Sequence, residues 1–237
     1  MSSGYPKYIS AEEKKAKAAK SMAKLQKKDP TLEPVILEGR ALARSWWGKA
    51  WNTNLESYAD YSNRIARGKT YVRSNAVLDL KIAKGLVQAK VQGSRAKPYD
   101  VTIQIDPLRP EKWERTTALC NRRIDSLEQL IEGKFPQELE VLFTDRAYGI
   151  FPSPGEIRFA CSCPDWASMC KHVAAALYGI GARLDKDPML FFELRGRDGH
   201  ELIKTTMESK VEAMLKNAGR KSPRELDEAA AADLFKL

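Results

Sequence analysis

Three of the four cysteines and one of the two histidines in this chain of 237 residues lie within twelve residues of one another. They are Cys161, Cys163, Cys170 and His172, in the order C-x-C, six residues, C-x-H. Thiolates and an imidazole can surround one Zn²⁺ ion tetrahedrally, and four protein ligands make a closed structural site rather than an open catalytic one. The spacing therefore predicts one structural zinc ion at these residues.

Two other chemistries are weaker interpretations of the same residues. A redox dithiol is disfavoured because the chain has no C-x-x-C, and a C-x-C pair on a strand is poorly placed to form a disulfide. A catalytic thiol would need one cysteine to differ from the rest, whereas here four ligands suit one ion. The remaining candidates, Cys120 in a helical pattern and His200 near a helix start, are predicted to be a buried spectator and a surface residue.

The elements around the cluster are predicted to bring its two halves together. Cys161 and Cys163 are two apart on a predicted strand, so their side chains leave the same face. The turn from Pro152 to Gly155 lies between two apolar runs, which predicts that this strand is the second of a hairpin. Cys170 and His172 open a helix with one apolar face.

Alternating patterns earlier in the chain predict an antiparallel meander. Apolar residues recur at every second position in three stretches, 78–82, 87–92 and 99–105, joined by turns at Lys84-Gly85 and Gly93–Pro98. Residues 70–73 are a candidate for a further strand.

Helical patterns flank this meander on both sides. Ser10 and Glu13 form a capping-box pair at the start of a lysine-rich helix over 10–28. A second helix is predicted from Ser45 to Gly68, with a core face of aromatic and aliphatic residues, and further helices over 110–143 and from Ser222. The fold class is α+β, divided into 1–34 (lysine-rich helix), 35–108 (helix and meander), 109–145 (helical connector), 146–200 (zinc-stapled ββα finger) and 201–237 (helical tail).

Positive charge is concentrated in two parts of the sequence. Residues 61–100 hold nine Lys/Arg against two acids, and residues 1–30 hold eight Lys against three acids. Three thiolates and a neutral imidazole would leave a zinc site at about −1, so the metal itself is not expected to attract phosphates. Nucleic-acid contacts are instead predicted at Arg64, Arg67, Lys69, Arg73, Lys84, Arg95 and Lys97. The alternative interpretation is a solvated basic surface.

The cysteine motif resembles the SWIM zinc finger. The match is carried by Cys161, Cys163, Cys170 and His172, with Pro164-Asp165-Trp166 between the ligand pairs, and the stretch "WWGKAWNTNLESYADYSNRIARG" is similar to the N-terminal part of bacterial SWIM-finger proteins. The resemblance implies a module that binds DNA or protein and often accompanies Swi/Snf-type helicase-like ATPases. Asp165 and Trp166 are candidates to pack over the site or orient His172, or to have no part in it.

These features predict an accessory protein and not an enzyme. Two histidines, one of them a zinc ligand, leave little acid–base machinery, and no phosphate-binding G-x-x-x-x-G-K-[ST] motif is present, so an ATPase or RNA polymerase would be a separate partner. The favoured ligand is nucleic acid, with DNA preferred, and the alternative is a protein-interaction adaptor. No run of eighteen apolar residues and no secretory signal pattern is present, which predicts no membrane segment and a cytoplasmic location.

Overall fold

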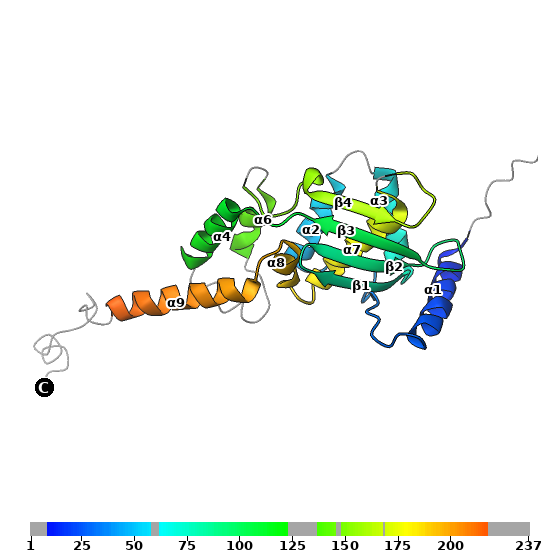
Figure 1. Cartoon of the computed structure of the whole chain (residues 1–237), viewed down its shortest axis with the longest axis horizontal. Helices are drawn as coiled ribbons and strands as arrows, with labels where there is room; N and C mark the ends of the chain where they lie inside the picture. The colour runs from blue at the N-terminus through cyan, green and yellow to red at the C-terminus, as the bar shows by residue number, and fades with distance from the viewer. Residues whose placement is uncertain (1–8, 58–61, 123–136, 146–147, 168, 218–237) are drawn as a thin grey trace, which may run out of the picture.

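The structure is a computed structural model that describes residues 9–57, 62–122, 137–145, 148–167 and 169–217. A four-stranded antiparallel sheet lies at its centre, in the order β1 (Val77–Ala83), β2 (Leu86–Val91), β3 (Tyr99–Ile105) and β4 (Ile157–Cys161). The predicted α+β class and the three-stranded meander are therefore confirmed. Figure 1 shows the sheet in front, with helices behind it and at both of its ends.

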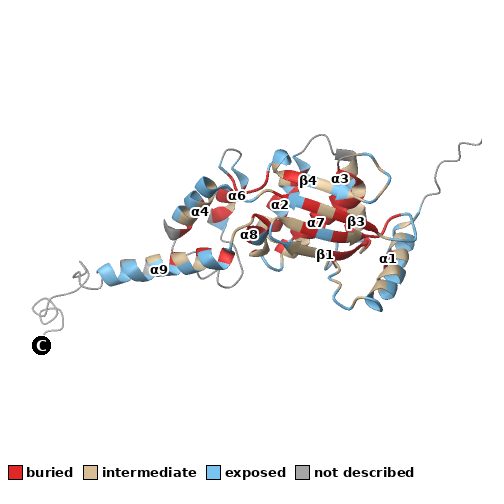
Figure 2. Ribbon diagram, in the orientation of Figure 1, coloured by how far each residue is buried: buried red, intermediate tan, exposed pale blue. Residues whose placement is uncertain are grey.

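The inner face of the sheet is covered by α7 (Lys171–Leu184), which contacts all four strands, and α2 (Trp46–Glu56) and α3 (Ser62–Arg73) pack against α7. Apolar side chains alternate with polar ones along β2 and β3, so Val87, Ala89 and Ile103 are buried while Gln88 and Gln104 are exposed. Figure 2 shows the buried residues gathered between the strands and the helices behind them. Burial of one alternating face drives this arrangement.

The strand that carries the first cysteine joins the meander instead of forming its own hairpin. Ile157 pairs with Ile105, and Cys161 pairs with Val101, so β4 is the fourth strand of the same sheet. Before it, residues 154–156 form the 3-10 turn η4 (Pro154–Glu156), capped by Ser153. The hairpin prediction was wrong because the apolar positions of β4 continue the inner face of β3. The predicted segments 35–108 and 146–200 thus share one sheet.

The predicted helix from Ser45 to Gly68 is two helices, α2 and α3, and residues 58–61 between them lie outside the described residues. Gly68 does not end a helix but lies within α3, where an added Cβ would come within 2.6 Å of the Ala174 Cβ. The glycine therefore permits close packing of α3 on α7. Residues 70–73, a candidate strand, are the last turn of α3.

The remaining elements flank the two ends of the sheet (Figure 1). One end carries α1 (Ala11–Gln26), whose predicted capping box of Ser10 and Glu13 is present. Towards the other end lie α4 (Pro110–Arg122), η3 (Gln137–Leu139), α6 (Glu140–Thr144), α8 (Leu190–Leu194) and α9 (Gly199–Asn217). Residues 123–136, in the predicted helical connector, and the predicted helix start at Ser222 lie outside the described residues.

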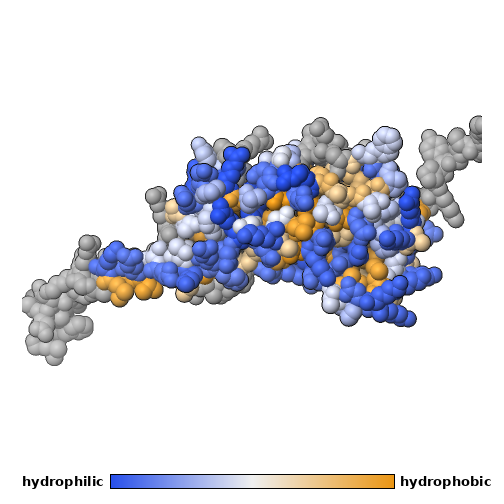
Figure 3. Space-filling model, viewed as in Figure 1, coloured by the Kyte–Doolittle hydropathy of each residue, from blue (hydrophilic) through white to orange (hydrophobic). Residues whose placement is uncertain are grey.

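Two features of this second end are not visible in the sequence. Arg195 is fully buried, and its guanidinium donates to the Asp106 carbonyl (2.8 Å) and to the Glu156 carboxylate (2.9 Å). The second feature is a row of exposed apolar side chains on α9, visible as orange atoms in Figure 3, formed by Met207, Val211, Met214 and Leu215.

Candidate metal centre and its basic surroundings

The four predicted ligands converge where β4 ends and α7 begins. Cys161 is the last residue of β4, Cys170 is the N-cap of α7, and His172 lies in the first turn of that helix. Their ligand atoms and that of Cys163 all lie within 4.8 Å of one another. The four residues therefore form a cluster that could hold a metal ion.

The separations within the cluster suit a single ion. Nδ1 of His172 lies 3.9 Å from Sγ of Cys161 and 3.8 Å from Sγ of Cys170. A tetrahedral shell with bonds of about 2.0–2.3 Å places its ligand atoms roughly 3.3–3.8 Å apart. Only small movements would be needed to close this shell around an ion.

A hydrogen bond joins two thiols of the cluster. Accepted from Cys161, it lowers the pKa of Cys170 in spite of burial, helped by His172 and by backbone N–H groups at the start of α7. The same hydrogen bond, together with burial, raises the pKa of Cys161. These shifts favour the thiolate at Cys170, and the thiolate is the form that binds metals.

The imidazole of His172 is held in place by two rings and a glycine. The Tyr99 ring lies 4.4 Å from it between centroids, and the Tyr71 ring lies 5.3 Å from it, edge-on. At Gly93 an added Cβ would come within 2.7 Å of His172 Nε2, so the β2–β3 turn presses directly on the ring. Nε2 is buried with no hydrogen-bond partner in the described chain, which leaves Nδ1 to face the thiols.

The loop between the two ligand pairs carries Asp165 and Trp166, which were candidates to pack over the site or to orient His172. The Asp165 carboxylate pairs with the Arg64 guanidinium at 2.6 Å and also accepts the Ala167 N–H at 3.3 Å. Trp166 is 100% exposed, so it does not pack over the cluster. Asp165 instead anchors the loop to α3.

The predicted nucleic-acid contacts separate into three groups. Three of them are already engaged within the fold: Arg64 with Asp165, Lys69 with Glu56 at 2.8 Å, and Arg73 with the carbonyl of Arg40 at 3.3 Å. Lys84 lies apart from the others, in the β1–β2 turn near Gly196. The third group is Arg67, Arg95 and Lys97, which are exposed and form no ion pair with another described residue.

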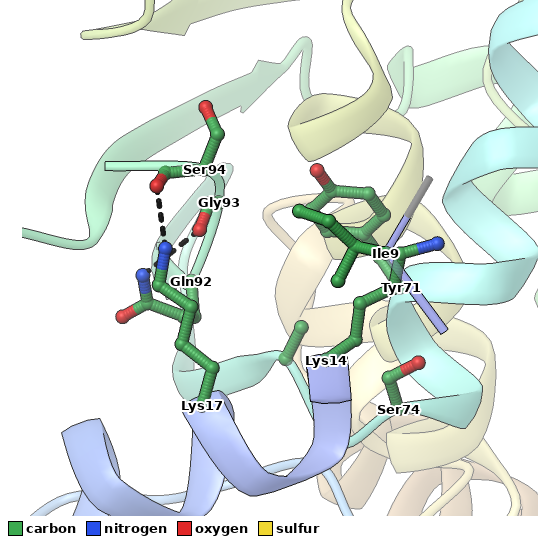
Figure 4. A pocket seen from close by; sticks show the side chains of 9 residues that line it. Ile9, Lys14, Lys17, Tyr71, Ser74, Gln92, Gly93 and Ser94 are labelled. Atoms are coloured by element: carbon green, nitrogen blue, oxygen red, sulfur yellow. Dashed lines mark hydrogen bonds between the residues drawn. The ribbon is translucent and has the colours of Figure 1, made fainter. Parts of the chain in front are cut away.

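The structure adds lysines of α1 to this third group. Lys17 donates to the carbonyl of Ser94, and Lys14 lines a pocket between α1 and the β2–β3 turn, on the same side as Ile9 and Tyr71 (Figure 4). The buried amide of Gln92 donates to the carbonyls of Gly93 and Arg95 and so shapes the turn. We call the six cations around this end of the sheet the basic end: Lys14, Lys17, Arg67, Arg95, Lys97 and Lys171.

Sequence reasoning missed Lys14 and Lys17 as members of this surface. The density of lysines in residues 10–28 was the available signal, but it did not show where the helix docks. The close approach of Gly93 to His172 could not be predicted from the sequence, which shows only that Gly93 lies in a turn.

Comparison with known proteins identifies one relative. The chain is 34% identical over 164 residues to the protein described as "Uncharacterized protein Rv2102" of Mycobacterium tuberculosis (strain ATCC 25618 / H37Rv), a match that covers 69% of this chain and 59% of that protein. The chain thus spans less than two thirds of the length of this relative. No protein-family model and no solved structure matches the chain. The resemblance to SWIM fingers stays a prediction.

None of the described helices is both long enough and apolar enough to cross a membrane.

Proposed function

We propose that this protein is a non-enzymatic accessory protein that binds nucleic acid, DNA in the first instance, and whose binding end is organised by a structural zinc ion. The observation that carries the proposal is the basic end, because six cations from four separate elements gather around the Cys/His cluster. Concentrated positive charge on one surface is the electrostatic footprint of a nucleic-acid-binding protein.

Zinc is the metal that the ligand set favours. Three sulfur atoms and one imidazole nitrogen in a compact cluster suit tetrahedral Zn²⁺, and no fifth ligand is needed. With a formal charge of about −1, the zinc site would organise Gly93, Cys161 and the start of α7 without attracting phosphates itself. The phosphates would contact the exposed cations of the basic end.

The partners we propose follow from the resemblance to bacterial SWIM-finger proteins. They are a separate Swi/Snf-type helicase-like ATPase or RNA polymerase, acting with this chain on DNA in the cytoplasm. A non-catalytic role fits the chemistry of the described histidines, since His172 belongs to the cluster and His200 is exposed at the start of α9.

A second candidate function, a protein-interaction adaptor, is favoured by α9. Its exposed Met207, Val211, Met214 and Leu215 recur at helical spacing on one face, and such a stripe suits a protein partner. The two functions differ in what the basic end does, so a test directed at that end separates them.

The first experiment measures the salt dependence of DNA binding. Each phosphate contact contributes about 0.9 to the slope of log K against log salt, so reversing Arg67, Arg95 and Lys97 to Glu together should flatten the slope by about 2 to 3. The matched control is Lys84→Glu, an exposed cation in the β1–β2 turn at the opposite end of the sheet, which should change the slope by less than about 1.

The result is read from duplex titrations at several salt concentrations. Absence of binding by the parent protein at low salt contradicts the proposal and leaves the adaptor function. An equal effect of Lys84→Glu and the triple variant would contradict the assignment to the basic end.

A further inference from the structure

Trp166 is the feature of the molecule that the proposed function has not yet used. It is 100% exposed, although tryptophan is large and mostly apolar and is usually buried for most of its surface. The other large apolar side chains of the cluster region, such as Met169 and Val173, are buried. A solitary exposed indole beside a metal cluster requires an explanation.

The loop that displays Trp166 is anchored on both sides of it. On one side the Asp165 carboxylate is bound to Arg64 at 2.6 Å and accepts the Ala167 N–H. On the other side Met169 is fully buried, and Cys163 and Cys170 bracket the loop within the cluster. The backbone that carries the indole is therefore anchored at residues close to it on both sides, which lowers the cost of ordering this loop when a ligand binds.

The surroundings of the indole distinguish between ligand classes. Its neighbours along the chain are Pro164, Asp165 and Ala167, so it does not lie in a run of large apolar residues like the stripe on α9. Cations lie on the two helices joined to this loop: Arg67 is one turn after Arg64 on α3, and Lys171 opens α7. Among the described residues, Asp165 within the loop is paired with Arg64, and Asp100, which contacts Ser162, is paired with Lys90. A lone aromatic face flanked by cations suits a nucleobase attached to phosphates.

We propose that Trp166 is a stacking platform for an unpaired base, so that the preferred ligand of the basic end is single-stranded nucleic acid. The base would lie on the indole, and the phosphates on either side of it would contact Arg67 and Lys171. In a duplex the base faces are covered by their neighbours, so the indole has nothing to stack on. This inference rests on the proposed function and narrows its ligand class.

The test compares Trp166→Ala and Trp166→Phe with the parent on two probes, an oligothymidine about 20 nucleotides long and a duplex of the same length. Loss of one stacked base should weaken binding of the single strand about 5- to 100-fold in the alanine variant. The phenylalanine variant should retain most of the affinity, and duplex binding should change less than about twofold. The matched control is Tyr148→Ala, which removes another exposed aromatic ring, from the loop after α6, and should leave both affinities unchanged.

Intrinsic fluorescence provides a second readout at the same residue. Binding of oligothymidine should quench the emission of the parent, and the quenching should disappear in Trp166→Phe. Metal content and melting temperature should be equal in all variants because the indole makes no buried contact.

Two failures are distinguishable. If the parent binds neither probe at low salt, the proposed function fails. If the parent binds DNA but neither its affinity for the single strand nor the fluorescence change depends on Trp166, the stacking inference is overturned. The exposed indole would then suit contact with a protein partner instead.

Discussion

The two ends of the sheet are stabilised in different ways. At the end near α8, aromatic rings of α6, α8 and the segment before η4 pack together, with Phe143 and Phe191 at 4.9 Å between centroids, and Arg195 is buried at the same end. At the opposite end, which we call the metal end because it holds Cys161, Cys163, Cys170 and His172, the contacts are a glycine against an imidazole, a loop tied by one ion pair, and four candidate ligand atoms. One hydrophobic core reaches both ends, but the first end adds a cluster of aromatic rings, whereas the second adds a Cys/His cluster that could hold a metal ion.

This difference explains how the metal end can expose so much polar and aromatic surface. A hydrophobic core needs large apolar side chains, and these cannot also contact a ligand in water. A metal bound at the cluster would order a loop with few residues, which would allow Trp166, Arg95 and Lys97 to stay on the surface. The comparison predicts that metal removal will affect one end only.

The largest effect is expected from Cys163→Ser. Structural zinc contributes about 10–16 kcal/mol in small finger peptides, so losing a ligand should release the metal and remove hydrogen-exchange protection from β4, the loop and the first turn of α7. The matched control is Cys120→Ser, at a buried cysteine of α4 outside the cluster, which should keep the metal. An equal loss of hydrogen-exchange protection at both ends of the sheet would contradict the prediction that metal removal affects the metal end alone.

The next largest effect is expected from the ion pair of Glu156 with the buried Arg195, at the end of the sheet near α8. Burial raises the pKa of Glu156, but hydrogen bonds and charge from Arg195, with hydrogen bonds from Ser153, outweigh it and lower the pKa from 4.5 to about 2. The side chain is 20% exposed, so this shift corresponds to about 3 kcal/mol of stability.

Because the folded pKa is depressed, this stability is present above pH 4.5 and is lost as the pH falls towards 2. Glu156→Gln should therefore destabilise the protein by up to about 3 kcal/mol at pH 7, and by much less near pH 2. Urea unfolding of the metal-free parent and variant at both pH values measures this, because acid protonates thiolate ligands and would release a bound metal at pH 2. An equal destabilisation at both pH values would refute the role of the charge.

A smaller effect is expected at Gly93. An added Cβ would come within 2.4 Å of the Tyr99 ring and 2.7 Å of His172 Nε2, so Gly93→Ala should displace the imidazole, cost about 1–3 kcal/mol and weaken metal binding. Gly155→Ala is the matched control, because nothing lies within 4 Å of its added Cβ. Metal affinity measured by competition with a chelator checks the prediction, which fails if the two variants behave alike.

The parts of the molecule predicted from sequence are those set by local patterns. Alternation located β1, β2 and β3, and the Ser10 capping box located the start of α1. The cysteine spacing predicted four residues that the fold does bring within 4.8 Å. Each of these depends on residues close together in the chain.

The parts that were missed depend on distant contacts. The pairing of β4 with β3 joins residues more than fifty positions apart in the chain. Gly68 was interpreted as a helix end because glycine often ends helices, and its contact with Ala174 of α7 cannot be seen in the sequence. The docking of α1 beside the β2–β3 turn, which adds Lys14 and Lys17 to the basic end, rests on contacts such as that of Lys17 with Ser94. Local periodicity contains no information on such neighbours.

The central claim is that one zinc ion, held by Cys161, Cys163, Cys170 and His172, organises the metal end. Its most direct test is the metal content of the whole protein purified without chelators, measured by elemental analysis beside the Cys163→Ser variant. We expect one zinc per chain in the parent and none in the variant. A parent without zinc, or a variant that retains it in full, would contradict the role proposed for the four residues.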